Sequence, residues 1–311
     1  FFKAVAAPGE FFRHKTEALL KPYFVTLGLL LLTTILLGHE GALNEALGIL
    51  YGTGRTIRWS PLWFLTLLWV LFMGSYVLVR GFRLDTRPGR VQLLVLLGVL
   101  VFGVFWMGLF KAVEVGVFGQ RYVLPGLPFS IDLIFISMAF FMAGHFLSQQ
   151  VKLFKPNPWL LVGMGVLFFS VVLFSEASID LNRRVYQEPV LATLGALSGI
   201  YLVLSCAYFF SQVPSIKGFF KLFGSASLFI LIFHYFLLLK LQAWFDHWIA
   251  PEWGLLGATV AYGISVTLPL LIKTVVERNR FLRPLYFPFK RVRAQKIAEI
   301  SSVAVNKMSS G

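Results

Sequence analysis

The feature that most constrains the fold is a series of long, almost uninterrupted apolar stretches. A helix needs about 20 apolar residues to cross roughly 30 Å of membrane hydrocarbon. Eight stretches meet this requirement, near residues 22–38, 61–79, 91–110, 129–148, 158–175, 190–211, 224–242 and 254–275. The chain is therefore expected to be an all-α integral membrane protein, a polytopic helical bundle of about eight transmembrane helices.

The amino-acid composition excludes an ordinary soluble globule. Hydrophobic residues make up 58% of the 311-residue chain and charged residues 14%, whereas soluble domains have about 45–50% and about 25%. The single cysteine, Cys206, lies within an apolar stretch, so an intrachain disulfide or a cysteine-based zinc site cannot form. We expect no metal ion and no permanently bound cofactor. No basic soluble module points to a nucleic-acid partner.

Three prolines are expected to mark helix starts. Pro22, Pro61 and Pro158 stand at or near the first positions of apolar stretches. A missing N–H costs no hydrogen bond there, because the first turn of a helix has no internal partner for it.

The basic residues predict the orientation in the membrane. Of the 28 lysines and arginines, 21 fall in the N-terminal segment, the C-terminal tail and the connections that share a side with them. Positively charged connections stay in the cytoplasm, so both ends of this chain are expected there. Residues 1–276 are expected to form the transmembrane domain and residues 277–311 a basic cytoplasmic tail that lies on anionic lipid.

One group of polar residues lies at the cytoplasmic end of the first apolar stretch. Arg13, Lys15 and Lys21 cluster between Phe11 and Phe24. Anchoring of the helix by positive charge explains them. The alternative is a cationic site for a phosphorylated donor, because lysine and arginine bind phosphate.

A second group lies on the predicted outer side. Trp63 begins the second apolar stretch, where it belongs either to an aromatic belt or to the wall of an external cavity. Asp132 stands a few residues inside the fourth stretch, where an unpaired charge is expensive. Arg183 or Arg184 could pair with Asp132; alternatively, the carboxylate interacts with a helix N-terminus.

Further polar residues of the same outer segment suggest a sugar-binding function. Asn182, Arg183 and Tyr186 accompany the carboxylate, and such side chains satisfy hydroxyl groups. We therefore expect Trp63 and Asp132 to contribute with them to an acceptor site.

His234 lies in the middle of the seventh apolar stretch. A histidine among packed helices is often a structural group, but ionisable residues inside membranes also face cavities and move protons. The sequence lacks HExxH, GxSxG, P-loop and dinucleotide-binding motifs, so zinc proteolysis, ordinary serine hydrolysis and nucleotide hydrolysis have no support.

Several of these segments, in this order, resemble the membrane-bound acyltransferase 3 family, and most of all its fucose 4-O-acetylase-like branch. The matching segments are Leu20–Phe24 (LKPYF), Pro61–Leu65 (PLWFL), Leu127–Gly144 (LPFSIDLIFISMAFFMAG), Asp180–Tyr186 (DLNRRVY) and Gly224–His234 (GSASLFILIFH). The resemblance covers the chain up to about residue 275.

The resemblance implies an enzyme of the bacterial cytoplasmic membrane. Such proteins move an acyl group, usually acetyl, from cytoplasmic acyl-CoA to a hydroxyl of an envelope polysaccharide or lipid-linked sugar, and they have about ten spans. The family's first span carries an arginine and a histidine about ten residues apart, and this chain has no such span. We therefore expect the first two helices to be absent and the chain alone to be inactive.

The resemblance also distributes the candidate residues between two substrates. Arg13, Lys15 and Lys21 would hold acyl-CoA on the cytoplasmic side, and His234 is the internal candidate for proton transfer. A transporter or flippase of a lipid-linked sugar is the alternative, since it would also need an external polar site. A purely structural membrane subunit is a third possibility.

Overall fold

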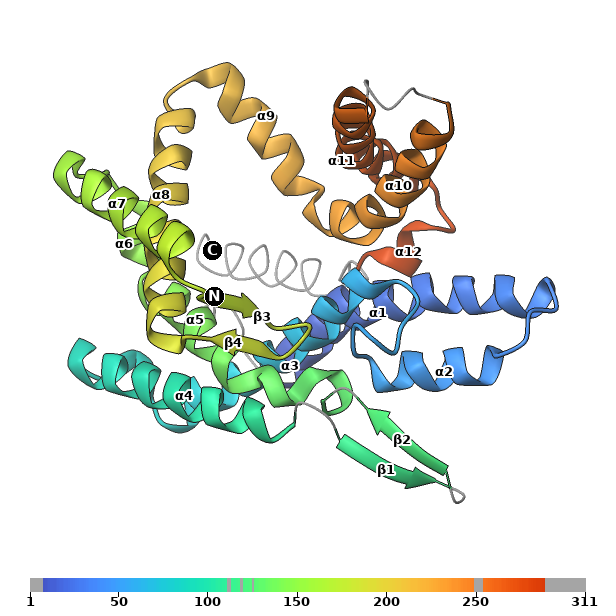
Figure 1. Ribbon diagram of the computed structural model, residues 1–311, viewed down its shortest axis with the longest axis horizontal. Coiled ribbons are helices and arrows are strands. Elements are labelled where there is room, and N and C mark those ends of the chain that lie inside the picture. Colours follow the sequence, from blue (N-terminus) through green and yellow to red (C-terminus); the bar gives the residue numbers. More distant parts are fainter. Residues whose placement is uncertain (1–7, 111–112, 118–119, 125, 249–253, 289–311) are drawn as a thin grey trace, which may run out of the picture.

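A computed structural model describes residues 8–110, 113–117, 120–124, 126–248 and 254–288. Its helices (Figure 1) are α1 (Pro8–Leu36), α2 (Ala42–Tyr51), α3 (Trp63–Gly81), α4 (Gly89–Leu109), α5 (Ile134–Phe146), α6 (Ser148–Lys152), α7 (Pro158–Phe174), α8 (Pro189–Ser211), α9 (Pro214–Ser225), α10 (Ser227–Trp248), α11 (Gly254–Arg278) and α12 (Arg283–Tyr286). Three short 3-10 helices are η1 (Ser60–Leu62), η2 (Leu84–Thr86) and η3 (Pro128–Leu133). Two antiparallel hairpins join β1 (Val113–Val117) to β2 (Gln120–Leu124) and β3 (Ser178–Asp180) to β4 (Val185–Gln187). The predicted tail, residues 277–311, is described as far as residue 288.

The helical membrane fold predicted from the apolar stretches is confirmed. Seven helices within the described ranges are long and apolar enough to cross a membrane: α1, η1 with α3, α4, η3 with α5, α8, α10 and α11. The remaining predicted stretch forms α7, an apolar helix of 17 residues. The chain is thus a multi-pass membrane protein.

The structure corrects the start of the first helix. α1 begins at Pro8, so Pro22 lies inside the helix and not at its first position. The residues before Pro22 join the helix because Phe11 and Leu19 are buried against the core. Pro158, by contrast, is the first residue of α7, as predicted, and the Asn157 side chain caps this helix.

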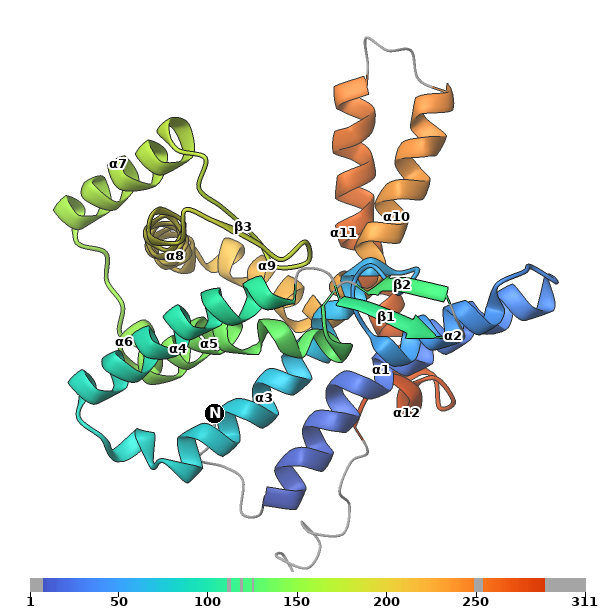
Figure 2. The same cartoon turned by 60° about the horizontal axis from the view of Figure 1, so that its bottom comes forward.

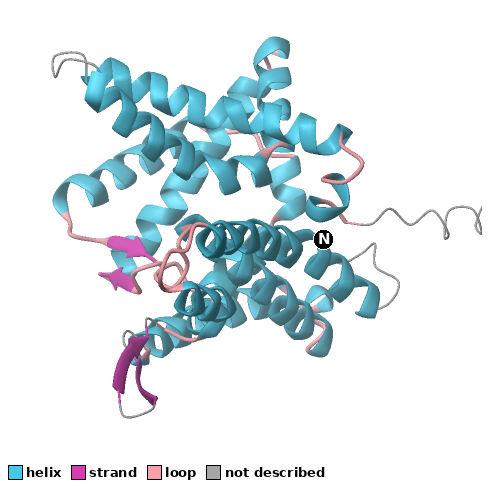
Figure 3. Ribbon diagram, turned by 90° about the vertical axis from the view of Figure 1, so that its right-hand side faces the viewer, coloured by secondary structure: helices cyan, strands magenta, loops and turns pink. Residues whose placement is uncertain are grey.

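Helix α9 and the two β-hairpins were not expected from the sequence. The predicted loop between α8 and α10 contains α9, an amphipathic helix. Both β-hairpins also went unpredicted, because their strands have only three to five residues. Figure 3 shows the two hairpins on the same side of the molecule.

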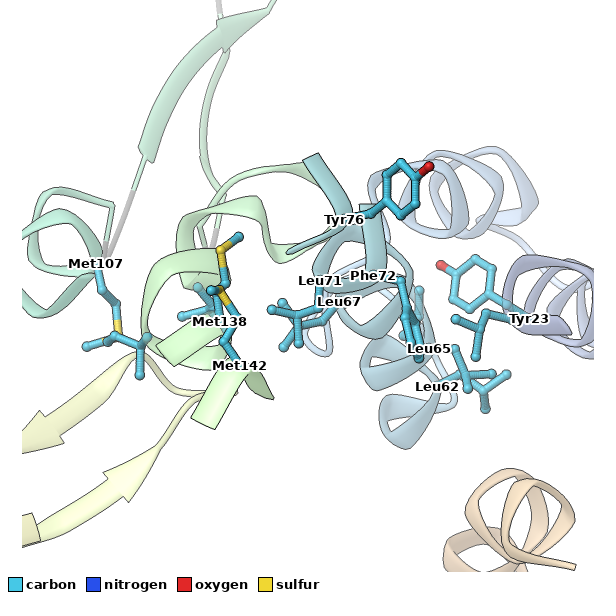
Figure 4. Packing of buried hydrophobic residues seen from close by; sticks show 14 of the residues in the cluster. Tyr23, Leu62, Leu65, Leu67, Leu71, Phe72, Tyr76, Met107, Met138 and Met142 are labelled. Atoms are coloured by element: carbon cyan, nitrogen blue, oxygen red, sulfur yellow. The ribbon is translucent and has the colours of Figure 1, made fainter. Parts of the chain in front are cut away.

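The buried core centres on α3. In the most apolar 18-residue stretch of η1 and α3, 56% of the residues are buried, whereas the corresponding share is 11% in α4 and in α10. Helix α3 packs against α1 on one side and α5 on the other, and Figure 4 shows Leu67 of α3 in the cluster that also contains Tyr23, Met107 and Met142. The Tyr23 hydroxyl donates a hydrogen bond to the carbonyl of Ile49 at 2.7 Å, which fixes α2 to α1.

The other helices are arranged in pairs around this centre. α4 packs against α5, and α7 packs against α8. α10 and α11 form an antiparallel pair that projects from the rest of the molecule (Figure 2). The outer faces of these helices carry exposed leucine, valine and phenylalanine, as expected where the solvent is lipid.

Gly103 allows α4 to approach α5 closely. A Cβ atom at this position would lie 2.6 Å from the backbone nitrogen of Ile136 and 3.0 Å from the carbonyl carbon of Phe135. These neighbours are backbone atoms of a helix, so they cannot move without shifting α5. Gly98 lies on the same helix and has no such neighbour within 4 Å.

Gly103→Ala should therefore destabilise the protein, whereas Gly98→Ala should not. Forcing a methyl group into a packed interface typically costs about 1–3 kcal/mol, while alanine in an open helix position is neutral or slightly favourable. The measurement is the thermal midpoint of each variant in detergent, from the monomeric fraction that remains after heating. Equal midpoints for the two variants would contradict the close contact between α4 and α5.

Candidate functional site

A buried ion pair joins the β3–β4 hairpin to the start of the fourth predicted span. The Arg184 Nε donates to Asp132 Oδ2 at 3.0 Å, and Nη2 lies 3.3 Å from Asp132 Oδ1. The same guanidinium donates to the Ser130 hydroxyl at 3.3 Å and to the carbonyl of Asn182 at 2.9 Å. The Arg184 and Asp132 side chains are 1% and 0% exposed, so two opposite charges are fully removed from solvent here.

The backbone around the ion pair adopts left-handed conformations at several positions. Ser130 and Arg184 both have positive φ angles, of 54° and 57°. Gly126 has a φ of 77°, and a Cβ atom there would collide with the Arg184 guanidinium. Asp132 Oδ1 also accepts the backbone N–H of Leu127 at 2.8 Å. Both carboxylate oxygens are thus occupied by groups of the protein.

Tyr51 attaches α2 to the segment around the buried ion pair. Its hydroxyl donates to the carbonyl of Gly126 at 2.6 Å. Burial raises the pKa of Tyr51, and the nearby Asp132 raises it further while Arg184 opposes the change. The phenol therefore stays neutral and remains a hydrogen-bond donor. The segment before α3 thus contributes a helix, α2, to this site.

Trp63 and Asn182 meet at Gly54. A Cβ atom on Gly54 would collide with Asn182 Oδ1 and would lie 2.9 Å from Trp63 Cδ1. Both side chains are partly exposed. We name Trp63, Asp132, Asn182 and Arg184 the hairpin site, because the β3–β4 hairpin brings its members together.

The two other residues predicted for the acceptor lie beside the hairpin site. Arg183 is 74% exposed and forms an ion pair with Asp180 at 3.5 Å. Tyr186 is buried, and its hydroxyl lies 2.6 Å from the Thr193 hydroxyl of α8. Burial raises the pKa of Tyr186, while the hydrogen bond with Thr193 lowers it. Tyr186 thus fixes β4 to α8, and Arg183 is the accessible cation.

The three predicted donor residues occupy different surroundings along α1. Arg13 is exposed and pairs with Glu17 at 3.1 Å. The Lys15 ammonium lies 3.6 Å from the centre of the Phe72 ring on α3. Lys21 donates to two backbone carbonyls, those of Pro284 and Phe287, each at 3.1 Å. The structure therefore distributes these cations and does not gather them into one cluster.

His234 is half-buried on α10. Its Nδ1 lies 2.6 Å from the carbonyl oxygen of Ile230. A carbonyl can only accept, so Nδ1 carries the proton and Nε2 holds the lone pair of the neutral ring. The neighbouring Phe233 and Phe236 contact Trp59, just before η1. This part of α10 therefore packs against the segment that leads to Trp63.

One polar pair was not recognised in the sequence. His145 Nε2, at the end of α5, lies 2.8 Å from Asp85 Oδ1 in η2. The two residues are 60 positions apart, and only the packing of α3, α4 and α5 brings them together. No spacing pattern could have found this pair.

The comparisons with known proteins identify one family. A family model described as an acyltransferase domain matches residues 6–274. No curated protein and no solved structure shows a significant match to the chain.

Asp132→Asn should strongly destabilise the protein, and Asp180→Asn should not. The first change leaves the buried Arg184 charge without its partner, at a cost of about 3–5 kcal/mol. The second removes an ion pair whose partners are 45% and 74% exposed, and exposed pairs contribute about 0–1 kcal/mol. The thermal midpoint and the monomeric yield in detergent measure both effects. Similar midpoints for the two variants would show that the buried pair does not hold the hairpin.

Proposed function

The chain belongs to the acyltransferase domain family, and we propose that it moves an acyl group, usually acetyl, from cytoplasmic acyl-CoA to a hydroxyl of an extracytoplasmic sugar. The family match over most of the chain is the observation that carries this proposal. It supports a membrane acyltransferase as the general activity. The donor, the acceptor and the roles of single residues are the finer parts of the proposal.

The hairpin site supports a role in acceptor binding. Asp132 and Arg184 have no exposed surface to offer a ligand, so we assign them to positioning the hairpin. Trp63 and Asn182 are partly exposed, and an aromatic ring beside a few hydrogen-bonding groups is typical of ligand sites. Arg183 stands next to them and supplies an accessible cation. We propose that these three side chains contact the sugar.

Contacts along α1 support a separate role in donor binding. Arg13 is the most accessible of the three predicted cations, and its exposed pair with Glu17 is easily exchanged for a phosphate. Lys15 and Lys21 lie six residues apart in the chain, about 9 Å along a helix. Acyl-CoA carries several phosphates, so cations dispersed along α1 can each meet one of them.

The reaction requires a proton to leave the acceptor. The sugar oxygen attacks the thioester carbonyl, the C–S bond breaks, and the proton of the hydroxyl passes to a base while the CoA thiolate takes up a proton. We propose His234 as a proton-handling residue, since its Nδ1 contact leaves the Nε2 lone pair to accept a proton.

Arg13→Gln and Arg183→Gln should weaken the binding of different substrates. Each variant loses one exposed arginine with one exposed or partly exposed carboxylate partner, so folding should be preserved. Arg13→Gln should raise the KM for acyl-CoA by about three- to tenfold, and Arg183→Gln should do the same for the acceptor. Because these contacts exist in ground and transition states alike, kcat should change little.

The assay follows radiolabelled acyl transfer to envelope glycan in membranes that carry the full-length protein. Identical effects of both variants on both substrates would contradict the separation into two sites. If the protein moves lipid-linked sugar across vesicles and consumes no acyl-CoA, the acyltransferase proposal is wrong and the transporter alternative replaces it.

His234→Gln should reduce turnover by about 100-fold or more while the folded yield stays unchanged, because a positioned base contributes about 10² to 10⁴ in rate. His247→Gln is the control, since His247 lies near the exposed end of the same helix and should leave turnover unchanged. A loss of yield with normal turnover per folded molecule would instead assign His234 a structural role.

A further inference from the structure

An apolar groove runs along one face of α11. Its α11 side chains recur at intervals of three or four residues, which places them on one face of the helix. These side chains are Ile264, Thr267, Leu268, Leu271 and Thr274, and together with the adjacent Leu270 and with Leu222 of α9 they line a cavity of about 560 Å³. Leu271 and Leu222 are exposed, so the groove opens sideways.

Helix α9 is fixed beside the groove by a polar contact. The Lys273 Nζ donates to the Ser225 hydroxyl at 3.1 Å. Lys273 also forms an ion pair with Glu277 at 3.5 Å. Glu277 is the one carboxylate among the residues that line a second cavity, at the end of α11. Lys273 therefore contacts both α9, beside the groove, and a residue that lines that cavity.

An arginine-lined cavity of about 460 Å³ follows at the end of α11. Arg278, Arg280 and Arg283 line it together with Asn279 and Pro284. Arg278 comes four residues after Thr274, so it continues the face of the groove about 6 Å further along the helix.

The backbone of this corner is held in place from two sides. Lys21 donates to the carbonyls of Pro284 and Phe287. The Tyr286 ring is buried against Phe229 of α10, and its hydroxyl lies 3.3 Å from the Thr26 hydroxyl. The cavity is thus part of the packed structure where α1, α11 and α12 meet.

From this arrangement we infer that the α11 groove and its arginine cavity bind an anionic phospholipid. An acyl chain fits the apolar groove, and the phosphate reaches the guanidinium groups, which bind phosphate through paired N–H donors. Three arginines face one carboxylate that already has a lysine partner, so the charge of the cavity favours an anion. The end of α11 lies on the predicted cytoplasmic side, where anionic lipids produce a negative surface potential. The inference does not depend on the proposed acyl transfer.

The test compares lipids bound to the purified full-length protein by native mass spectrometry. Phosphatidylglycerol and phosphatidylethanolamine are added in equal amounts, and we expect wild-type protein to retain phosphatidylglycerol about tenfold more. Arg278→Gln with Arg283→Gln should abolish this preference. The control is Arg87→Gln with Arg90→Gln, which removes two exposed arginines from the same predicted side outside the cavity and should keep the preference.

A second pair of variants tests the groove. Thr274→Trp fills it and should reduce retention of both lipids by about tenfold. Thr259→Trp alters an exposed threonine of the same helix that makes the same kind of hydroxyl-to-backbone hydrogen bond, and it should have no effect.

Acyl-CoA is added as a competitor to distinguish the two sources of phosphate. We expect phosphatidylglycerol to stay bound at acyl-CoA concentrations that saturate the protein. If acyl-CoA displaces phosphatidylglycerol from the wild-type protein but not from the Arg278 and Arg283 double variant, the cavity belongs to the donor and the lipid inference is overturned. Equal retention of both lipids by wild-type protein would also overturn it.

Discussion

The end of this protein that carries the β3–β4 hairpin depends on one ion pair that is almost fully buried. Two opposite charges cost several kcal/mol each to remove from water, and their attraction offsets this cost only if every remaining donor and acceptor is satisfied. Asp132 and Arg184 meet this condition through Ser130, Leu127 and the carbonyl of Asn182. Because the requirement is geometric, it fixes the backbone of two separate segments, residues 127–132 and 182–184.

The lipid surroundings explain why a polar site can be concentrated in so small a region. Most helices need only to present apolar side chains outwards, and their sequences are similar for that reason. Helix α3 differs, since it is buried on several sides and carries the contacts that organise α1 and α5. Trp63 is its first residue. The hairpin site is thus built on the most firmly held helix among the described residues.

The sequence predicted the helical fold well and the site only in part. Apolar stretches near 20 residues leave no alternative to helices in lipid, so each expected stretch contains one. Short strands carry no comparable signal, and α9 was missed because its apolar residues occupy one face only. Asp132 was recognised because a charge within an apolar stretch is conspicuous. Arg184, and not its neighbour Arg183, pairs with Asp132 because the backbone at Arg184 is left-handed. An arginine in the sequence does not indicate this conformation.

The separation of the buried pair along the chain has a consequence for biosynthesis. Asp132 and Arg184 lie 52 residues apart, so at about 5–20 residues per second the ribosome needs roughly 3–10 s to add the arginine after the aspartate. During that interval the carboxylate lacks its partner Arg184. Asp132 lies in η3, ahead of the apolar body of α5. The buried pair can therefore close only after α7 and the β3–β4 turn have been made.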